Sequence, residues 1–356
     1  MPRRKKERKR APSKDLFSGC LLGQCLGDAL GFPVEGTLPD ACRLYVDRVL
    51  TGFKEGTFGP EKMDISPYTL GQYTDDSQLA RELMISYATC GEFDPEDYAR
   101  RICEIFAQHR VVGGGIATLQ AALRLKSGIP WTESGEPPPS AGNGTAMRAG
   151  PVGLIFGDNP ETMLKVAHDQ GRITHMDKRC SAGSVAIAGA VALAARMYPL
   201  DMDSFLTTLG EWVGVYHEDF ALYIEELAIW TRLDPETAVV PISKCGRAPE
   251  YREDWKFISP FVIPSVLWSL YSFLRSPGDY WTTITTAISC GGDVDTTGAM
   301  AGAISGAHLG LGGLPEHLVG YIHDRGDWGY DELVRLAESC YDVAFGDDAR
   351  KAATLT

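Results

Sequence analysis

The chain has 356 residues, of which 44% are hydrophobic, so it can bury a substantial core and is not an intrinsically disordered protein. Its formal net charge is −13, but residues 1–14 contribute eight Lys or Arg and one Glu, so the remainder carries −20. A body this acidic should repel nucleic acid, and the lack of an uninterrupted run of about 18 apolar residues excludes a membrane-spanning helix.

The N-terminal segment is strongly basic. We expect residues 1–14 to form a solvated, flexible tail, with a nuclear address or a nucleic-acid-binding arm as the alternative. A signal peptide is disfavoured because Gln24 and Asp28 interrupt the apolar run that follows. Nine cysteines without a Cys-x-x-Cys pair favour free thiols in a reducing compartment. We therefore expect a cytoplasmic protein whose residues 15–350 form a single domain.

Two segments carry glycine at every fourth position. The first has Gly19, Gly23, Gly27 and Gly31, and the second has Gly298, Gly302, Gly306 and Gly310. Glycine inside a helix costs about 1 kcal/mol relative to alanine, so this spacing calls for a compensating close approach of two backbones. We predict that the two helices are central, lie near each other and lie near the functional site.

Apolar residues recur at helical spacing along most of the chain, and alternating strand patterns are scarce. Beyond residue 175, helices are predicted near 178–197, 203–231, 260–275, 279–289, 295–310 and 330–345. The longer irregular segments are predicted at 52–73, 128–142 and 233–257. The pattern favours an all-α fold, a compact orthogonal helical bundle.

Two acidic clusters lie more than two hundred residues apart, Thr74-Asp75-Asp76-Ser77 and Gly292-Asp293-Val294-Asp295-Thr296-Thr297. Each is predicted to begin a helix, and a helix cap alone would explain the first. Neither contains His or Cys, so the available ligands are hard oxygens, which suit Mg²⁺, Mn²⁺ or Ca²⁺. Because gathered carboxylates repel one another unless cations separate them, the two clusters together predict one central metal site.

Three further motifs lie between these clusters or before them. Glu35 ends the first glycine-rich helix and begins a loop, where most glutamates are merely solvated. Gly142-Asn143-Gly144 precedes the apolar run 146–156, so its amides are predicted at a helix start, where an anion binds readily; a plain turn is the alternative. His175 lies in a polar break between helices, where a capping or core role is the alternative to ligand binding.

Taken in order, these motifs resemble the ADP-ribosylglycohydrolase family. The resemblance extends from Gly19 to about Gly310 and rests on five matches: Gly27-Asp28-Ala29-Leu30-Gly31 followed by Glu35, Thr74-Asp75-Asp76-Ser77, Gly142-Asn143-Gly144 continuing to Met147-Arg148, Ile173-Thr174-His175, and Gly291-Gly292-Asp293-Val294-Asp295-Thr296. Each match is weak alone, but their order and separation are specific.

The resemblance implies an all-helical hydrolase that cleaves the glycosidic bond between ADP-ribose and a modified side chain, with an ADP-ribosylated protein as the expected partner. It implies two Mg²⁺ or Mn²⁺ ions held by Thr74, Asp75, Asp76, Asp293, Asp295 and Thr296. It implies catalytic roles for Glu35, Asp76 and Asp293, and substrate binding by Gly142, Asn143, Gly144 and His175. The acidic site favours ADP-ribosyl-arginine, and O-linked ADP-ribose (serine-linked, poly- or O-acetyl-ADP-ribose) remains the alternative.

Two departures from the family pattern bear on the leaving group and the metal site. Ser77 stands where many relatives have threonine, which preserves a hydroxyl, and residues 176–179 and 233–257 look individual to this chain. A prenyl-diphosphate synthase is a rival helical metal enzyme, but its Asp-Asp-x-x-Asp motif fails because Leu79 occupies the last position. A non-catalytic ADP-ribose-binding relative is the second rival, and the complete set of metal ligands argues against it.

Overall fold

The computed structural model describes residues 10–57, 69–247 and 257–353, with side chains described up to residue 346. Within these ranges the protein is helical, and the only β-type pairing consists of isolated bridges between loops. The all-α prediction is confirmed. No helix among the described residues is long and apolar enough to cross a membrane.

The α-helices are, in chain order, α1 (Lys14–Gly31), α2 (Pro39–Tyr45), α3 (Thr51–Lys54), α4 (Asp75–Cys90), α5 (Pro95–Ala107), α6 (Ile116–Lys126), α7 (Gly150–Phe156), α8 (Pro160–Arg172), α9 (Lys178–Arg196), α10 (Met202–Gly214), α11 (Glu218–Trp230), α12 (Pro235–Ile242), α13 (Val262–Arg275), α14 (Tyr280–Ser289), α15 (Val294–Leu309), α16 (Glu316–Val319) and α17 (Tyr330–Ala353). Short turns η1 (Phe32–Val34), η2 (Val46–Leu50) and η5 (Leu311–Gly313) extend α1, α2 and α15. Three helices begin with an Asp or Asn cap followed by proline, a strong start signal, at Asp94, Asn159 and Asp234.

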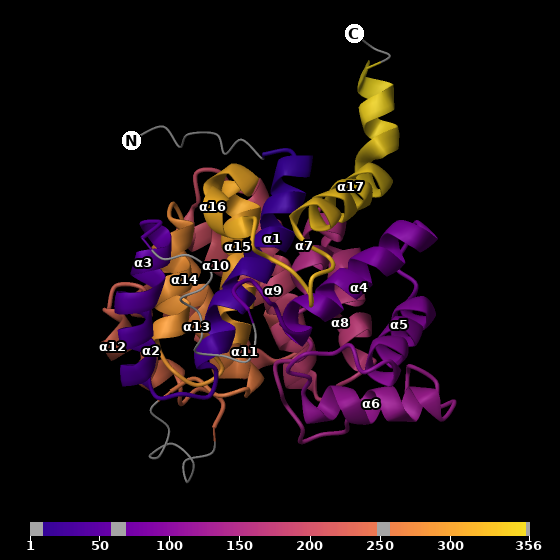
Figure 1. Cartoon of the computed structure of the whole chain (residues 1–356). Helices are drawn as coiled ribbons and strands as arrows, with labels where there is room; N and C mark the ends of the chain where they lie inside the picture. Colours follow the sequence, from indigo (N-terminus) through magenta and orange to yellow (C-terminus); the bar gives the residue numbers. More distant parts are fainter. Residues whose placement is uncertain (1–9, 58–68, 248–256, 354–356) are drawn as a thin grey trace, which may run out of the picture.

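Helices α1 and α15 form the centre of the molecule and run antiparallel (Figure 1). Their glycines face one another in pairs, so that a Cβ added to Gly302 would lie 2.2 Å from the carbonyl oxygen of Gly23, and one added to Gly27 would lie 2.1 Å from that of Gly298. Backbone atoms cannot give way as a flexible side chain can. The predicted close approach of the two glycine-rich helices is therefore confirmed.

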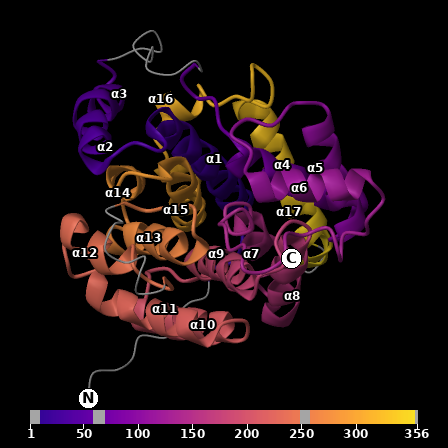
Figure 2. The same ribbon diagram turned by 90° about the horizontal axis from the view of Figure 1, so that it is seen from below.

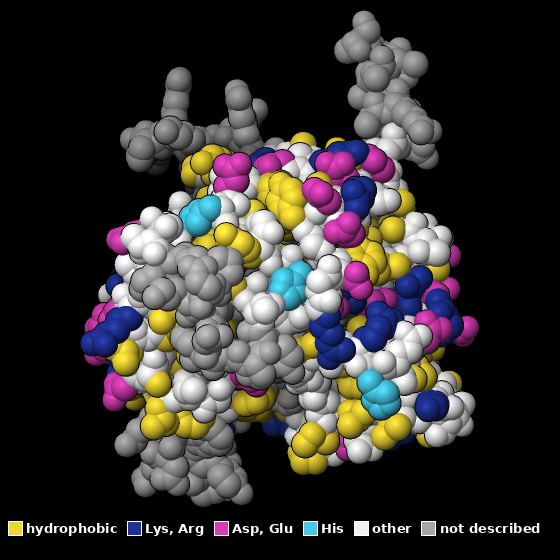
Figure 3. Space-filling model, viewed as in Figure 1, with side chains coloured by type: hydrophobic (Ala, Val, Ile, Leu, Met, Phe, Trp, Pro, Cys, Tyr) yellow, Lys and Arg dark blue, Asp and Glu magenta, His cyan; other side chains and the backbone are white. Residues whose placement is uncertain are grey.

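The other helices surround this pair. In Figures 1 and 2, α2, α3, α12 and α14 lie on one side of α1 and α15, and α4, α5 and α6 lie on the other. Helices α10 and α11 pack together at the edge next to α9 and α13. On the described part of the face in Figure 3, acidic and basic side chains are interspersed over the right half, and no large basic patch is visible there.

The structure corrects several predicted boundaries. The single helix predicted at 203–231 is two helices, α10 and α11, because the chain turns at 215–217 and the His217 ring accepts a hydrogen bond from the N–H of Phe220 as a new cap. Part of the segment predicted to be irregular at 233–257 is α12, capped by Asp234, although it contains Pro241. Residues 248–256 and 58–68 of the predicted loops lie outside the described residues.

The N-terminal tail lies mostly outside the described residues, which begin at Arg10. Arg10 itself contacts the body, because its backbone N–H donates to Arg196 and its guanidinium donates to the carbonyl of His308 at 2.6 Å. The described end of the predicted flexible tail, at Arg10, is therefore attached to the domain. All nine cysteines are free thiols, as predicted, and seven of them are buried.

Candidate active site

The first acidic cluster is held in place by a buried carboxylate on α1. Asp28 is fully buried and accepts four hydrogen bonds, from the backbone N–H groups of Thr74 (3.0 Å) and Ser77 (3.1 Å) and from the hydroxyls of the same two residues (3.0 and 2.7 Å). Thr74 is the N-cap of α4, as predicted. Asp28 thus fixes the start of α4, a role that the sequence analysis missed although a lone carboxylate inside a glycine-rich helix was its signal.

The second cluster follows a turn that requires glycine. Gly291 and Gly292 have φ of 74° and 87°, and a Cβ on Gly292 would lie 1.9 Å from the carbonyl oxygen of Ile258. Asp293 is the N-cap residue of α15, and the Asp295 carboxylate accepts from the backbone N–H of Thr296 at 2.8 Å. The turn therefore directs three oxygen side chains at one end of the central helix.

The fold brings the two clusters together. The Thr296 hydroxyl lies within hydrogen-bonding reach of both Asp76 and Asp293, which joins the start of α4 to the start of α15. One carboxylate oxygen each from Glu35, Asp293 and Asp295 lies within 4.8 Å of the others. The Glu35 loop is fixed to the second cluster by backbone hydrogen bonds from Gly36 to Gly292 (2.7 Å) and from Gly292 to Thr37 (2.9 Å).

The carboxylates destabilise one another's charged forms. Burial raises the pKa of Asp28 and of Asp75 to about 7 and that of Asp293 to about 6. Burial together with neighbouring carboxylates raises the pKa of Asp76 and Asp295 well above the usual range. Glu35 is the exposed member, but its carboxyl end loses hydration at the cluster and shares a hydrogen bond with Asp295, and its pKa is also raised.

These groups fit a hard divalent cation. The Asp76 Oδ1 atom is buried and has no hydrogen-bond partner among the described residues, although a buried carboxylate oxygen normally has one. The surrounding donors are carboxylate and hydroxyl oxygens, the set preferred by Mg²⁺ and Mn²⁺. A cation would supply the missing partner and offset the repulsion among the carboxylates.

The Gly142-Asn143-Gly144 loop lies between the second cluster and His175. The Asn143 amide nitrogen donates to the Asp293 carboxylate and to the hydroxyl of Ser265 (2.8 Å), so its side chain orients a carboxylate of the cluster. A Cβ on Gly142 or Gly144 would contact the His175 ring at 3.4 or 2.9 Å. The prediction that this loop begins a helix was wrong, because residues 144–148 form turns and α7 begins only at Gly150.

A second loop, Gly113-Gly114-Gly115, completes the surroundings of Asp75. The backbone N–H of Gly115 donates to the Asp75 carboxylate, and a Cβ on Gly113 would lie 3.4 Å from Asp75 Oδ1. Gln78 holds this loop by accepting from the N–H of Val112 at 3.0 Å, and it also donates to Asp324 near the C-terminus at 2.9 Å. The sequence analysis did not single out this loop, although three glycines before a helix are a signal.

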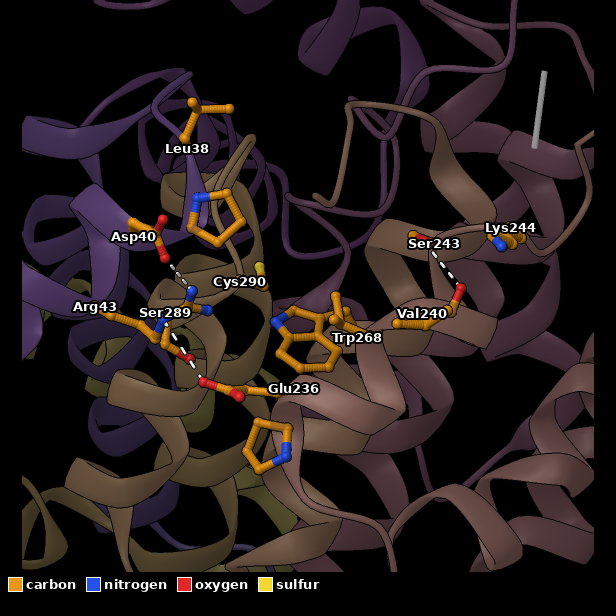
Figure 4. Close-up of a pocket in the computed structure, with 13 residues that line it drawn as sticks. Leu38, Asp40, Arg43, Glu236, Val240, Ser243, Lys244, Trp268, Ser289 and Cys290 are labelled. Carbon is orange, nitrogen blue, oxygen red and sulfur yellow. Dashed lines mark hydrogen bonds and ion pairs between the residues drawn. The ribbon is translucent and has the colours of Figure 1, made fainter. Parts of the chain in front are cut away.

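A separate groove of about 520 Å³ is lined by Leu38, which follows the Glu35 loop, and by Cys290, which precedes the Gly291-Gly292 turn (Figure 4). It contains none of the clustered carboxylates. Trp268 and Cys290 are buried at its floor, and its walls are formed by residues of α2 and α12, including the charged Asp40 and Arg43 and the apolar Val239. Arg43 pairs with Asp40 on its own helix and with Glu236 of α12 at 3.8 Å. The pair with Glu236 links α2 to α12 across the groove.

Comparison with known proteins gives one consistent result. The profile of the ADP-ribosylglycohydrolase family matches residues 9–350. ADP-ribosylhydrolase ARH3 of Gallus gallus is 30% identical over 333 residues, covering 85% of this chain and 88% of the relative. ADP-ribosylarginine hydrolase Tri1 of Pseudomonas putida is 25% identical, covering 93% and 79%. A solved ADP-ribosylglycohydrolase-related protein complex superposes with a TM-score of 0.66 at 25% identity, covering 93% of this chain and 98% of its own.

Proposed function

Because the chain belongs to the ADP-ribosylglycohydrolase family, we propose that it is a metal-dependent ADP-ribosylhydrolase that releases ADP-ribose from ADP-ribosyl-arginine. The observation that carries the proposal is the meeting of the α4 and α15 starts, with Glu35, around buried carboxylates whose pKa values are raised. Such a cluster is costly without a purpose, and perturbed carboxylates are concentrated at functional sites.

Two Mg²⁺ or Mn²⁺ ions would be held by Thr74, Asp75, Asp76, Asp293, Asp295 and Thr296. Bound there, the ions supply Lewis-acid polarisation of a water and of the ribose hydroxyls. The unpartnered Asp76 Oδ1 atom supports this assignment. Asn143 orients Asp293, and Asp28 keeps the start of α4 in place through Thr74 and Ser77.

Side chains of the cluster accept the proton and stabilise the charge that the reaction produces. Glu35 is the carboxylate that reaches the surface, and its raised pKa suits a general base that takes the proton of the attacking water. Asp76 and Asp293 stabilise the positive charge that develops on the sugar as the glycosidic bond breaks. The Gly142-Asn143-Gly144 loop and His175 would hold the diphosphate and ribose.

The choice of arginine as the leaving group rests on charge and on one relative. A guanidinium is attracted to a cluster with this excess of carboxylates, and Tri1 is named for ADP-ribosylarginine. Serine-linked, poly- and O-acetyl-ADP-ribose form the second candidate class. ARH3, the more similar of these two relatives, is named only as an ADP-ribosylhydrolase, so its name does not favour arginine. Cytoplasmic location and any binding of nucleic acid by the basic tail remain predictions.

The test is hydrolysis of arginine-, serine- and acetyl-linked ADP-ribose side by side, with Mg²⁺, with Mn²⁺ and with EDTA. Asp75→Asn and Asp295→Asn should abolish release of ADP-ribose while the helical circular dichroism spectrum is retained. Asp203→Asn, which removes an exposed carboxylate on α10, is the matched control and should keep full activity. Release that is unchanged in either cluster variant would refute the assignment, and calorimetry with ADP-ribose would identify a protein that binds without hydrolysis.

A further inference from the structure

Arg148 is a buried cation without an acidic partner. It is fully buried in the turn that follows the Gly142-Asn143-Gly144 loop, and among the described residues no carboxylate lies within ion-pairing distance of it. Its Nε donates to the Gln170 side chain at 2.8 Å, and its Nη2 donates to the Gln170 carbonyl (2.9 Å) and to the Thr174 hydroxyl (2.8 Å). Burying a guanidinium in this way is costly, so its position calls for an explanation.

The explanation begins at the Thr174 hydroxyl. Its oxygen accepts from Arg148, and its own proton can go either to His175 Nδ1 at 2.9 Å or to the Gly171 carbonyl at 3.4 Å. That carbonyl already accepts from the backbone N–H groups of Thr174 and His175, each at 3.0 Å. The shorter and less occupied acceptor is Nδ1, so the network places the hydroxyl proton on the bond to the ring.

An imidazole that accepts at Nδ1 carries its proton at Nε2 when it is neutral. The Nε2 atom faces the Gly142-Asn143-Gly144 loop, since a Cβ on Gly142 would lie 3.4 Å from it. His175 is only 3% exposed, and its ring lies against this loop. His175 therefore presents a fixed N–H donor on the side where the substrate diphosphate would lie.

The same surroundings keep the ring neutral. Burial and the Arg148 charge lower the pKa of His175 to about 3, and Asp177 is the one group that acts in the opposite direction. The Asp177 carboxylate is engaged by the Arg179 guanidinium at 2.6 and 2.9 Å, which limits its effect on the ring. The donor is thus independent of pH over the range in which an ordinary histidine titrates.

We propose that Arg148 is a positioning residue which, through Thr174, holds His175 in the neutral Nε2–H tautomer as a donor to the substrate diphosphate. The role of His175 in binding the diphosphate rests on the proposed function, but the tautomer of the His175 ring does not. Arg148 touches neither substrate nor reacting atoms. It acts by setting the orientation, the proton position and the charge of His175, which contacts the substrate.

The experiment uses the full chain with ¹³C- and ¹⁵N-labelled histidine, and the His175 signal is assigned from its loss in His175→Gln. The wild-type ring should show the Nε2–H tautomer and should not titrate between pH 5 and 8. Thr174→Val, which keeps the shape and removes the hydroxyl, should give a mixture of tautomers and raise KM for the ADP-ribosyl substrate about tenfold or more. Thr174→Ser is the matched control and should keep both the tautomer and KM.

Arg148→Met removes the charge but not the burial, so the pKa of His175 should rise above its wild-type value, and the His175 signal and kcat/KM should shift together toward higher pH. Arg148→Lys, which keeps the charge, should leave the ring neutral and serves if the Met variant does not fold. An Nδ1–H tautomer in the wild type, or an unchanged tautomer and KM in Thr174→Val, would overturn the proposal. Because the spectra need no turnover, a protein that hydrolyses no ADP-ribosyl compound would refute the proposed function and leave this tautomer test intact.

Discussion

The α1–α15 contact offers the sharpest test of how the fold builds the site. Gly302→Ala places a methyl group 2.2 Å from the carbonyl oxygen of Gly23, and 3.3 Å from the Tyr280 hydroxyl. An ordinary contact needs about 3.4 Å, so the two backbones must separate by about 1.2 Å at this point. The obstructing atoms on α1 are the carbonyl oxygen and carbon of Gly23, at 2.2 and 2.9 Å, and no rotamer change can move these backbone atoms away from the methyl group.

Two energy terms of opposite sign set the magnitude. Alanine in place of glycine stabilises a helix by about 1 kcal/mol, and overpacking a close-packed contact costs about 1–3 kcal/mol or more. The loss of dispersion along the separated helices adds to the second term. We expect a net destabilisation of about 2 kcal/mol, which corresponds to about 3 °C in Tm for a domain of this size.

Gly210→Ala is the matched control. Gly210 lies inside α10, and an added Cβ would meet its nearest neighbours at 3.8 and 3.9 Å, an ordinary contact. This variant should be as stable as the wild type or up to about 1 kcal/mol more stable. Thermal and urea unfolding measure both variants. Equal stability of Gly302→Ala and Gly210→Ala would refute the view that the glycine pairs exist for backbone contact.

Three further predictions concern the site. Asn143→Ala should weaken Mg²⁺ or Mn²⁺ binding by about 10- to 100-fold, because Asp293 loses the amide that orients it. Calorimetry measures the metal affinity. Ser265→Ala, which keeps the Asn143 amide, is the control. Asp28→Asn should lower stability by about 1–3 kcal/mol and abolish hydrolysis, because an amide cannot accept from all four donors at the start of α4; Asp203→Asn should do neither. In EDTA the Tm should fall as pH rises from 6 to 8, because the pKa values of Asp28, Asp75 and Asp293 are raised in the folded protein, which therefore holds protons that the unfolded chain has already released. Mg²⁺ should reduce the fall. A metal-free Tm that rises over this range would contradict the reasoning.

The sequence predicted the parts of the fold that depend on strong local signals. The glycine spacing predicted the central helix pair because no other role repays four helical glycines, and the oxygen-only clusters predicted where a hard cation would fit. The break between α10 and α11 was missed because apolar spacing continues across it. The signal for the break is the His217 ring, an unusual N-cap, which marks the start of α11.

The residues that support the site were harder to predict, since their role appears only in three dimensions. Asp28 and the Gly113-Gly114-Gly115 loop act on residues far from them in the chain, and their local signals, a lone carboxylate in a glycine-rich helix and three glycines before a helix, do not identify those residues. Asn143 was expected to bind substrate through its loop, but its side chain contacts Asp293, 150 positions away. Pairings across such separations are set by packing, which residue spacing does not encode.

Helix α1 explains how clusters so distant in sequence reach one place. Its glycines fix the position of α15 along its length, and Asp28, three residues before its last residue Gly31, accepts hydrogen bonds from the start of α4. The positions of both acidic helix starts are therefore set by one rigid helix, α1. Glu35 follows the end of α1 after the short turn η1. The positive ends of the α4 and α15 dipoles then face the carboxylates and offset part of their repulsion. Since a side chain on any of these glycines would shift α15 relative to Asp28, the smooth surface of α1 is as much a requirement of the candidate metal centre as the carboxylates themselves.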